Sequence, residues 1–397
     1  MREPLMPLSP RERLMHWAHV LQTTLFGVLD SETGPLSERA RLLVSVLEMV
    51  PLTRQLPCAR GWLGRPSKDR YQLAAAFFAK SIYGLETTRQ LLERLQNDRQ
   101  LRFLCGWTSA RQIPHESTFS RAFSEFAESE LPQRLHEALI LHTQKDRLVG
   151  HIARDSTAIE ARERFEGQAK HPAIPKRKPG RPRKGERALS GRRLPRQRRQ
   201  SLREMLHELP CHCALGVKTS SKGYCQYWRG YKLHLDVADG QIPVSCLLTA
   251  ASLHDSQAAI PLATLTAERV TSLYDLMDSA YDAGEIHAHS RSLGHVPIIA
   301  LNGSVAPVPN RVQKNLRLSY TWPRARVPKH YNRKRLPLTP AEEQRFEERT
   351  MVERVFSRLK DEFGARNIRL RSGCKIMAHL MFAITALTVD QLLKLTG

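Results

Sequence analysis

The sequence predicts a mixed α/β protein with an all-helical N-terminal domain. Three observations lead to this fold class. Residues 1–145 show helical periodicity, residues 148–300 alternate between short apolar runs and helical stretches, and 41% of the chain is apolar, enough for sizeable cores. The N-terminal helical domain is therefore expected over residues 1–145 and an α/β domain over residues 146–397.

The N-terminal domain contains recognisable helix starts. Apolar residues recur at helical spacing over residues 69–99, with a break near Gly84, after which Thr87 or Thr88 can cap a second helix. A further start signal lies in residues 114–121 and leads into a helix with phenylalanines on one side. Short helices joined by tight turns are typical of helix-turn-helix DNA-binding domains, and equally of small helical bundles.

The second domain is expected to begin with a strand and then to alternate. Asp239 and Gly240 supply the turn of a predicted hairpin. The apolar run from Ile376 to Val389 is too short to span a bilayer and is predicted to be a core helix. The expected strands cover residues 148–153, 227–238, 243–249, 272–277 and 296–300, and the expected helices cover residues 256–270, 283–293 and 340–364.

The chain carries a large excess of positive charge. Lys and Arg number 62 against 39 Asp and Glu, which gives a net charge of +23 and a pI near 10.2. Such an excess favours a polyanionic partner, most often nucleic acid. An anionic membrane surface is the alternative, but neither a signal peptide nor a spanning run supports it. We expect a DNA-binding protein with no membrane partner and no small-molecule substrate.

More than half of this charge lies in residues 168–203, which hold fourteen Lys or Arg and one acid, Glu186. The segment has few apolar residues and several Pro and Gly breaks, so a mobile basic arm is expected. Its Gly-Arg-Pro centre resembles an AT-hook, which enters the minor groove of A·T tracts; sequence-blind phosphate contact is the alternative. The DNA-binding candidates in the arm are Lys178, Arg181, Arg183 and Lys184.

The seven cysteines are scattered over a long chain, which favours a reducing cytoplasm over a disulfide framework. Cys211, Cys213 and Cys225 lie close in sequence, as zinc ligands often do. Their first pair, however, has C-x-C spacing and no second pair follows, so free thiols are predicted there.

Three acids are placed as a metal-dependent phosphoryl-transfer site requires. Asp155 follows the first expected strand, and Asp278 follows a later one. Glu353 lies on the helix expected over residues 340–364, four residues after Arg349 and beside an apolar seam. Three such carboxylates can hold divalent cations for an in-line displacement at phosphorus. The alternative for Glu353 is an ordinary solvated ion pair with Arg349.

The spacing Phe346-x₂-Arg349-x₃-Glu353-x₆-Lys360 is similar to the motif Y-x₂-R-x₃-E-x₆-K, with Phe in place of Tyr. On this motif the chain resembles the DDE transposases of bacterial insertion sequences, specifically those of the IS-four and IS-five groups. Further segments resemble the family in the same order along nearly the whole chain: residues 71–126, 152–157, 228–234, 250–256 and 278–283.

The resemblance implies an RNase H-like catalytic domain. Asp155, Asp278 and Glu353 would be the catalytic acids and would hold Mg²⁺ or Mn²⁺, with two ions expected. The acids are separated by 123 and 75 residues. The basic arm lengthens the first interval, and an insertion over residues 303–338 lengthens the second.

The resemblance also implies contacts with DNA. Arg349 and Lys360 would bind phosphates of the transposon end, and Phe346 and Lys232 are further DNA-binding candidates; His234, His254 and Asp255 lie next to the expected site. The expected protein is a cytoplasmic, nucleoid-associated transposase that binds the inverted terminal repeats of its element. It would cleave and join DNA as a homodimer in the synaptic complex. The alternatives are a domesticated non-catalytic DNA-binding protein and a structure-specific nuclease on the same fold.

Overall fold

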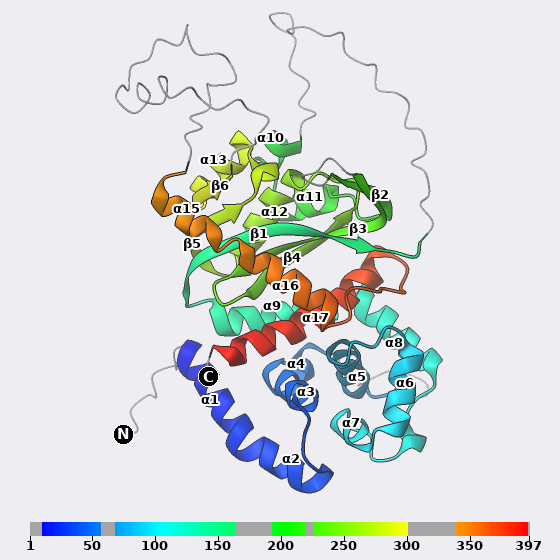
Figure 1. The fold of residues 1–397 in the computed structure, drawn as a ribbon. Helices are drawn as coiled ribbons and strands as arrows, with labels where there is room; N and C mark the ends of the chain where they lie inside the picture. Colours follow the sequence, from blue (N-terminus) through cyan, green and yellow to red (C-terminus); the bar gives the residue numbers. More distant parts are fainter. Residues whose placement is uncertain (1–9, 57–67, 164–192, 220–224, 301–337, 396–397) are drawn as a thin grey trace, which may run out of the picture.

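A six-stranded mixed sheet forms the centre of the part of the chain that follows residue 147 (Figure 1). The structure, a computed structural model, describes residues 10–56, 68–163, 193–219, 225–300 and 338–395. The strands are β1 (Leu148–Glu160), β2 (Ala214–Thr219), β3 (Cys225–Ala238), β4 (Ile242–Ala250), β5 (Thr271–Met277) and β6 (Val296–Ile299).

Strand β3 organises one half of the sheet and β1 the other. β3 pairs antiparallel with β1, and its two halves pair with β2 and with β4. On its other side, β1 pairs parallel with β5, which in turn pairs parallel with β6. The predicted hairpin is confirmed, and its turn requires Gly240, whose φ of +84° is strained for other residues.

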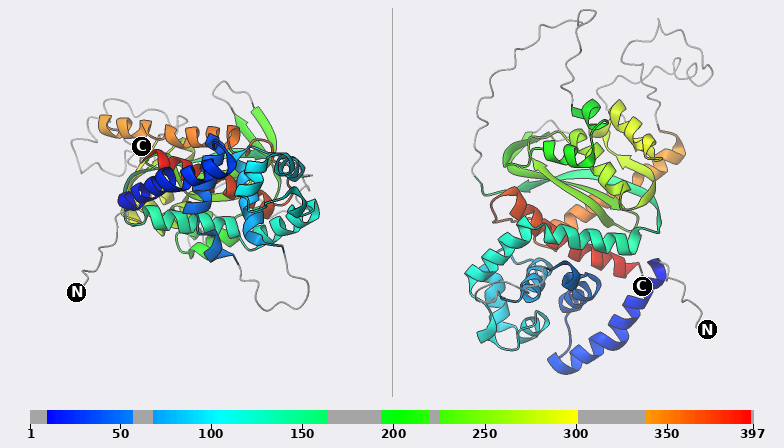
Figure 2. Two further views of the ribbon diagram at one scale, coloured as in Figure 1. Left: turned by 90° about the horizontal axis from the view of Figure 1, so that it is seen from below. Right: turned by 180° about the vertical axis from the view of Figure 1, so that it is seen from behind.

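Helices cover both faces of this sheet (Figures 1 and 2). One face packs against α12, which contacts β3 and β4, and the opposite face packs against α9, α16 and α17. The helices that follow β1 in the chain are α10 (Arg193–Gln197), α11 (Leu202–Glu208), α12 (Ser256–Ala267), η3 (Ser279–Tyr281), α13 (Gly284–Ser292), α15 (Pro340–Glu347), α16 (Thr350–Asp361) and α17 (Gly373–Lys394).

The elements that the structure describes before β1 are all helices. Asp69 and Thr87 cap the two helices expected over residues 69–99, and Thr87 forms a full capping box with Gln90. The elements are α1 (Pro10–Val20), η1 (Leu21–Leu25, a π-helical turn), α2 (Phe26–Thr33), α3 (Glu38–Met49), α4 (Leu52–Gln55), α5 (Arg70–Ile82), α6 (Thr88–Asn97), α7 (Arg99–Leu104), η2 (Ala110–Gln112), α8 (Glu116–Glu128) and α9 (Leu131–Gln144).

The C-terminal helix α17 joins the two regions. It packs on β4 and also on α3, α5, α8 and α9. Phe382 at its centre contacts the rings of Phe77, Phe78, Phe123 and Phe126. By length and composition α17 could cross a membrane, but 83% of its most apolar window is buried inside the protein. The prediction of a core helix here is confirmed.

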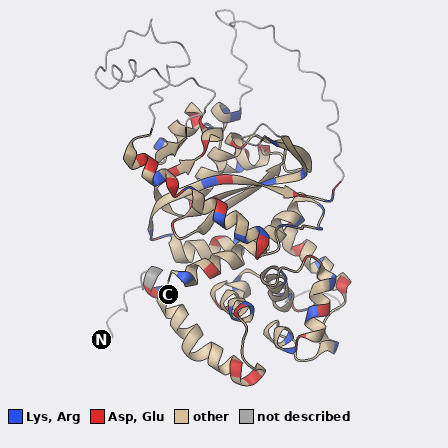
Figure 3. Ribbon diagram, viewed as in Figure 1, with Lys and Arg blue, Asp and Glu red and all other residues tan. Residues whose placement is uncertain are grey.

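The helix expected over residues 340–364 is divided in two, which corrects that prediction. Thr339 caps α15 through a capping box with Glu342, as its sequence suggests, but α15 ends at Glu347 and α16 begins at Thr350. Between them Arg349 N–H bonds to the Phe346 carbonyl, an i→i+3 contact that tightens the turn. Acidic and basic residues alternate along both helices (Figure 3).

The basic arm is shorter than the sequence predicts. Residues 193–203 form α10 and the start of α11, and Gln197 is fully buried with its amide donating to the Gln257 carbonyl. Arg193 also donates to the Gln257 side chain, at 2.6 Å. This part of the chain is therefore folded onto α12. Lys178, Arg181, Arg183 and Lys184 lie outside the described residues, as does the predicted insertion up to residue 337.

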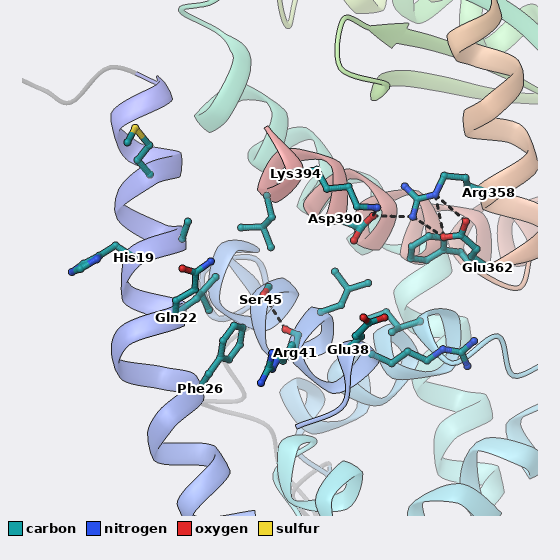
Figure 4. Close-up of a pocket in the computed structure, with 18 residues that line it drawn as sticks. His19, Gln22, Phe26, Glu38, Arg41, Ser45, Arg358, Glu362, Asp390 and Lys394 are labelled. Carbon is teal, nitrogen blue, oxygen red and sulfur yellow. Dashed lines mark hydrogen bonds and ion pairs between the residues drawn. The ribbon is translucent and has the colours of Figure 1, made fainter. Parts of the chain in front are cut away.

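A cavity of about 740 Å³ lies between the N-terminal helices and the ends of α16 and α17 (Figure 4). Phe26 and Arg41 line one side, and on the other Arg358 is paired with Glu362 and Asp390. None of the three predicted catalytic acids lines this cavity. The expected chemistry therefore has to be sought at the sheet.

Candidate active site

Two of the predicted catalytic acids lie side by side on neighbouring strands. The register pairs Arg154 of β1 with Met277 of β5, so the next residues along the two strands are Asp155 and Asp278. The sequence suggested that Asp155 follows the end of its strand. That prediction is wrong, because β1 continues to Glu160. Its extension, residues 156–160, pairs with residues 230–234 in the middle of β3, which the apolar pattern of β1 alone does not reveal.

The carboxylate of Asp155 is held at both oxygens. Oδ1 accepts a hydrogen bond of 2.7 Å from the N–H of Ser156, and Oδ2 lies 3.2 Å from Nη1 of Arg349. Burial, together with the negative charges of Asp278 and Asp255, raises the pKa of Asp155 to about 6 despite these two donors. The carboxylate therefore lies in an environment that favours a neighbouring positive charge.

Asp278 caps the short helix that follows β5. Its side chain accepts a hydrogen bond of 2.9 Å from the N–H of Ala280, which fixes the carboxylate at the edge of the sheet. Burial is the main cause that raises the pKa of Asp278, and the charge of Asp255 adds to it. Asp155 and Asp278 are thus both partly desolvated, and they directly follow the paired residues Arg154 and Met277 of two parallel strands.

Arg349 connects the third acid to the first. Its Nη2 lies 2.8 Å from Oε1 of Glu353, while its Nη1 reaches Asp155 on the sheet. The side chain of Glu353 is 55% exposed, so it lies at the surface where a large substrate can reach it. The ion pair with Glu353 is therefore part of a bridge between α16 and β1, in addition to the i,i+4 pair expected from spacing.

Phe346 and Lys360 flank this bridge along the helices. The half-buried ring of Phe346 packs against the main core, and the Arg349 guanidinium lies 5.7 Å from its centre. Nζ of Lys360 donates a hydrogen bond of 2.7 Å to Oγ1 of Thr157, two residues beyond Asp155. Burial lowers the pKa of Lys360, and the nearby cations Arg366 and Lys218 lower it further. Two of the four motif residues, Arg349 and Lys360, therefore bind neighbouring positions of β1, Asp155 and Thr157.

A comparison with models of protein families identifies the family of this chain. The model of the transposase DDE domain matches residues 150–389, which contain β1, the sheet and all three acids. The chain belongs to the DDE transposase family. A second model, described as a transposase domain of the DUF772 type, matches residues 32–125 in the helical region. No curated protein and no solved structure matches the chain significantly.

Membership of this family establishes the activity class. The transposase acts in DNA transposition, through metal-dependent DNA cleavage and strand transfer. The predictions of a transposase and of a DNA substrate are thereby confirmed. The central mixed α/β architecture of the catalytic part is confirmed as well.

The oxygen donors of the transposase fit a hard divalent cation such as those that DDE transposases generally use. Burial and like charge raise the pKa of both Asp155 and Asp278, which is the situation that a bound cation relieves. Among the residues that the structure describes, no group of three or more His, Cys, Asp or Glu side chains is already arranged as a metal site. Arg349 stands between Asp155 and Glu353 instead.

Lys232, which the sequence predicts to bind DNA, contacts other residues of the same chain in the structure. Its Nζ lies 3.0 Å from Oδ1 of Asp255 and donates to the Leu253 carbonyl at 2.9 Å. The side chain is 13% exposed, which leaves little of it for a DNA phosphate. Although burial opposes it, the charge of Lys232 and the hydrogen bonds from Lys232 and Ser156 lower the pKa of Asp255.

Sequence reasoning missed two buried groups next to the acids. Arg154, fully buried on the other face of β1, forms a bidentate pair with Asp236 of β3 at 2.6 and 2.7 Å. The hydroxyl of Tyr281 is buried without a hydrogen-bond partner in the described part of the chain, and Asp255, Asp155 and Asp278 raise its pKa further above its ordinary value. A charged residue inside an apolar strand was the available signal for Arg154.

Proposed function

We propose that this transposase is encoded by an insertion sequence of the IS-four or IS-five type and binds the inverted terminal repeats of its own element. The observation that carries this proposal is the meeting of Asp155, Asp278 and the Arg349–Glu353 pair over one edge of the sheet. The transposase would cleave the transposon end to expose a 3′-hydroxyl and join that hydroxyl to target DNA.

An RNase H-like catalytic domain is the fold we infer for residues 146–397. In support, three antiparallel strands in the order β4, β3, β1 are continued by the parallel strands β5 and β6. The first acid lies on the central strand, the second follows its parallel neighbour, and the third comes from a helix on the face of the sheet. This is the arrangement that the resemblance implies.

Asp155, Asp278 and Glu353 are the residues proposed to hold two Mg²⁺ or Mn²⁺ ions. When bound there, such ions supply a nucleophilic oxygen and stabilise charge on the leaving oxygen. Arg349 would keep the carboxylates of Asp155 and Glu353 ionised and in place. Lys360 uses one of its three N–H donors on Thr157, so the others can hold a phosphate of the transposon end.

The other parts of the chain are proposed to bind DNA outside the catalytic edge. Residues 1–145 would form the end-binding helical domain, in line with the transposase-type match over residues 32–125. The basic residues of the arm would add phosphate contacts. A homodimer would bring two transposon ends together in the bacterial cytoplasm.

The test is to neutralise each acid with little change of volume, as in Asp155→Asn, Asp278→Asn and Glu353→Gln. Each variant is expected to lose cleavage of end DNA while still binding it, because an anionic metal ligand has been removed. Glu348→Gln is the matched control, since Glu348 is an exposed glutamate one residue before Arg349. Its cleavage is expected to equal that of the wild type.

Residual cleavage above about a tenth of the wild-type rate in any of the three would show that this acid is misassigned. Product analysis on a supercoiled target separates the two alternative functions. Joined molecules are expected from a transposase, cut but unjoined DNA from a nuclease, and uncut DNA from a non-catalytic binding protein.

A further inference from the structure

Asp255 forms the centre of a hydrogen-bonded chain that ends at a catalytic carboxylate. Its Oδ1 accepts hydrogen bonds from Nζ of Lys232, at 3.0 Å, and from Oγ of Ser156, at 2.8 Å. The N–H of Ser156 in turn donates to Oδ1 of Asp155 at 2.7 Å. Three consecutive contacts therefore connect Lys232 on β3 to Asp155 on β1.

Because side chains alternate along β1, Asp255 can act on Asp155 only through the series of hydrogen bonds that passes through Ser156. Asp155 faces α16, whereas Ser156 faces the opposite side of the sheet, where α12 begins at Ser256. Asp255 precedes α12 and makes no side-chain cap of that helix, so its carboxylate is available to the strand. The hydrogen bond between Ser156 and Asp255 lies on one face of the sheet. It holds the backbone of β1 next to Asp155, whose side chain lies on the other face.

The anchor at the far end of the chain is rigid. Lys232 is held by two acceptors, Asp255 and the Leu253 carbonyl, and its ammonium lies 6.0 Å from the centre of the Trp228 ring. The Lys232 and Asp255 side chains are 13% and 23% exposed. An ion pair that is largely shielded from water holds its geometry better than one on the surface.

We propose that Asp255 is a positioning residue for Asp155, which it orients through Ser156, with Lys232 as the fixed support. This inference rests on the proposed catalytic role of Asp155. Ser156, held through its hydroxyl, presents its N–H to one oxygen of Asp155. Arg349 holds the other oxygen, so Ser156 and Arg349 together set the orientation of this carboxylate.

The test measures Mn²⁺ binding to the DNA-free protein by electron paramagnetic resonance, for Ser156→Ala, Asp255→Asn and the double variant. Each single variant is expected to weaken Mn²⁺ binding about tenfold, a usual size for the loss of a partner that orients a metal ligand. Because the two residues act in series, the double variant should lose no more than the weaker-binding single variant. DNA binding should remain at the wild-type level.

Asp239→Asn is the matched control. Asp239 also holds β1, by accepting from the N–H groups of Gly150 and His151 at 2.6 and 3.1 Å, but at the end of the strand remote from Asp155. A loss of thermal stability with unchanged Mn²⁺ binding is expected there. Equal weakening of Mn²⁺ binding by this control would reduce Asp255 to a general structural role and overturn the proposal.

Two further results would also overturn it. Wild-type Mn²⁺ affinity in Asp255→Asn would remove the positioning role, and additive losses in the double variant would show that Asp255 acts on the ion directly. The proposed catalytic site is checked separately with Asp155→Asn and Asp278→Asn. If these two bind Mn²⁺ as the wild type does, the catalytic assignment fails, whatever the Asp255 variants show.

Discussion

Removing Arg154 should destabilise the catalytic domain far more than removing an exposed arginine. Its guanidinium is 1% exposed and forms two hydrogen bonds, of 2.7 and 2.6 Å, with Asp236, which is 0% exposed. Burial raises the pKa of Asp236, whereas the charge and hydrogen bonds of Arg154 lower it, so Arg154 stabilises the charged form of this carboxyl group. Arg154→Met leaves this carboxylate buried and unpaired, at an expected cost of about 3–5 kcal/mol.

The measurement is urea unfolding followed by circular dichroism. The unfolding midpoint of Arg154→Met is expected to fall by at least about 1 M. In the double variant Arg154→Met/Asp236→Asn neither charge is left alone, so the loss should be smaller than the sum of the single losses by at least about 2 kcal/mol. The control is Arg196→Met, which breaks the half-exposed pair with Glu208 and should cost at most about 1 kcal/mol.

A cost below about 1 kcal/mol for Arg154→Met would refute this reasoning, because it would mean that Asp236 is not left as an isolated buried charge. Additive losses in the double variant would have the same meaning. In either case Arg154 would contribute to the domain mainly through the packing of its side chain, and another residue would have to compensate the Asp236 charge.

Three other predictions concern separate parts of the chain. Phe346→Tyr should keep cleavage and change the unfolding free energy by no more than about 0.5 kcal/mol, because the half-buried ring is retained; loss of activity would show that the hydroxyl is excluded there. Burial lowers the pKa of His136 to about 3, below its value near 6.5 in the unfolded chain, so stability falls as the pH drops below about 6.5. Because of this histidine, the free energy of unfolding should be about 2 kcal/mol lower at pH 5 than at pH 7, as measured by urea unfolding. The difference should disappear in His136→Gln and remain in the exposed control His19→Gln. Changing six arm residues to Gln should flatten the log–log salt dependence of DNA binding by about 0.9 for each DNA phosphate that the arm no longer neutralises, and should leave the melting temperature unchanged; an unchanged slope would contradict the arm's role. The six are Lys176, Arg177, Lys178, Arg181, Arg183 and Lys184.

The elements that carry a clear local signal were predicted in the right order, but β2, α10 and α11 were not predicted. Apolar alternation marks β3, and Asp239 and Gly240 mark the turn to β4. The break between α15 and α16 was not predictable. No Gly or Pro lies there, and both Glu348 and Arg349 keep right-handed helical backbone angles, so only the hydrogen-bond pattern changes.

The site was predictable as far as single elements determine it. Motif spacing predicts that Arg349 and Glu353 pair along one helix, and they do. The partner of Lys232 was not predictable, because it depends on how α12 packs against β3. Lys232 and Asp255 are 23 residues apart in the chain and meet only in the tertiary structure. The DNA role of Lys232 stays a prediction, to which the structure adds an ion pair with a carboxylate of the same chain.

Helix α17 ties the folding of the N-terminal region to a segment that is synthesised more than 200 residues later. The surfaces of α3, α5, α8 and α9 that it covers stay open until residues 373–394 have left the ribosome. A truncated transposase that lacks these residues would expose the phenylalanines that surround Phe382, and it would aggregate before it could occupy a transposon end. Chains that lack α17 should therefore not compete for DNA with chains that contain it.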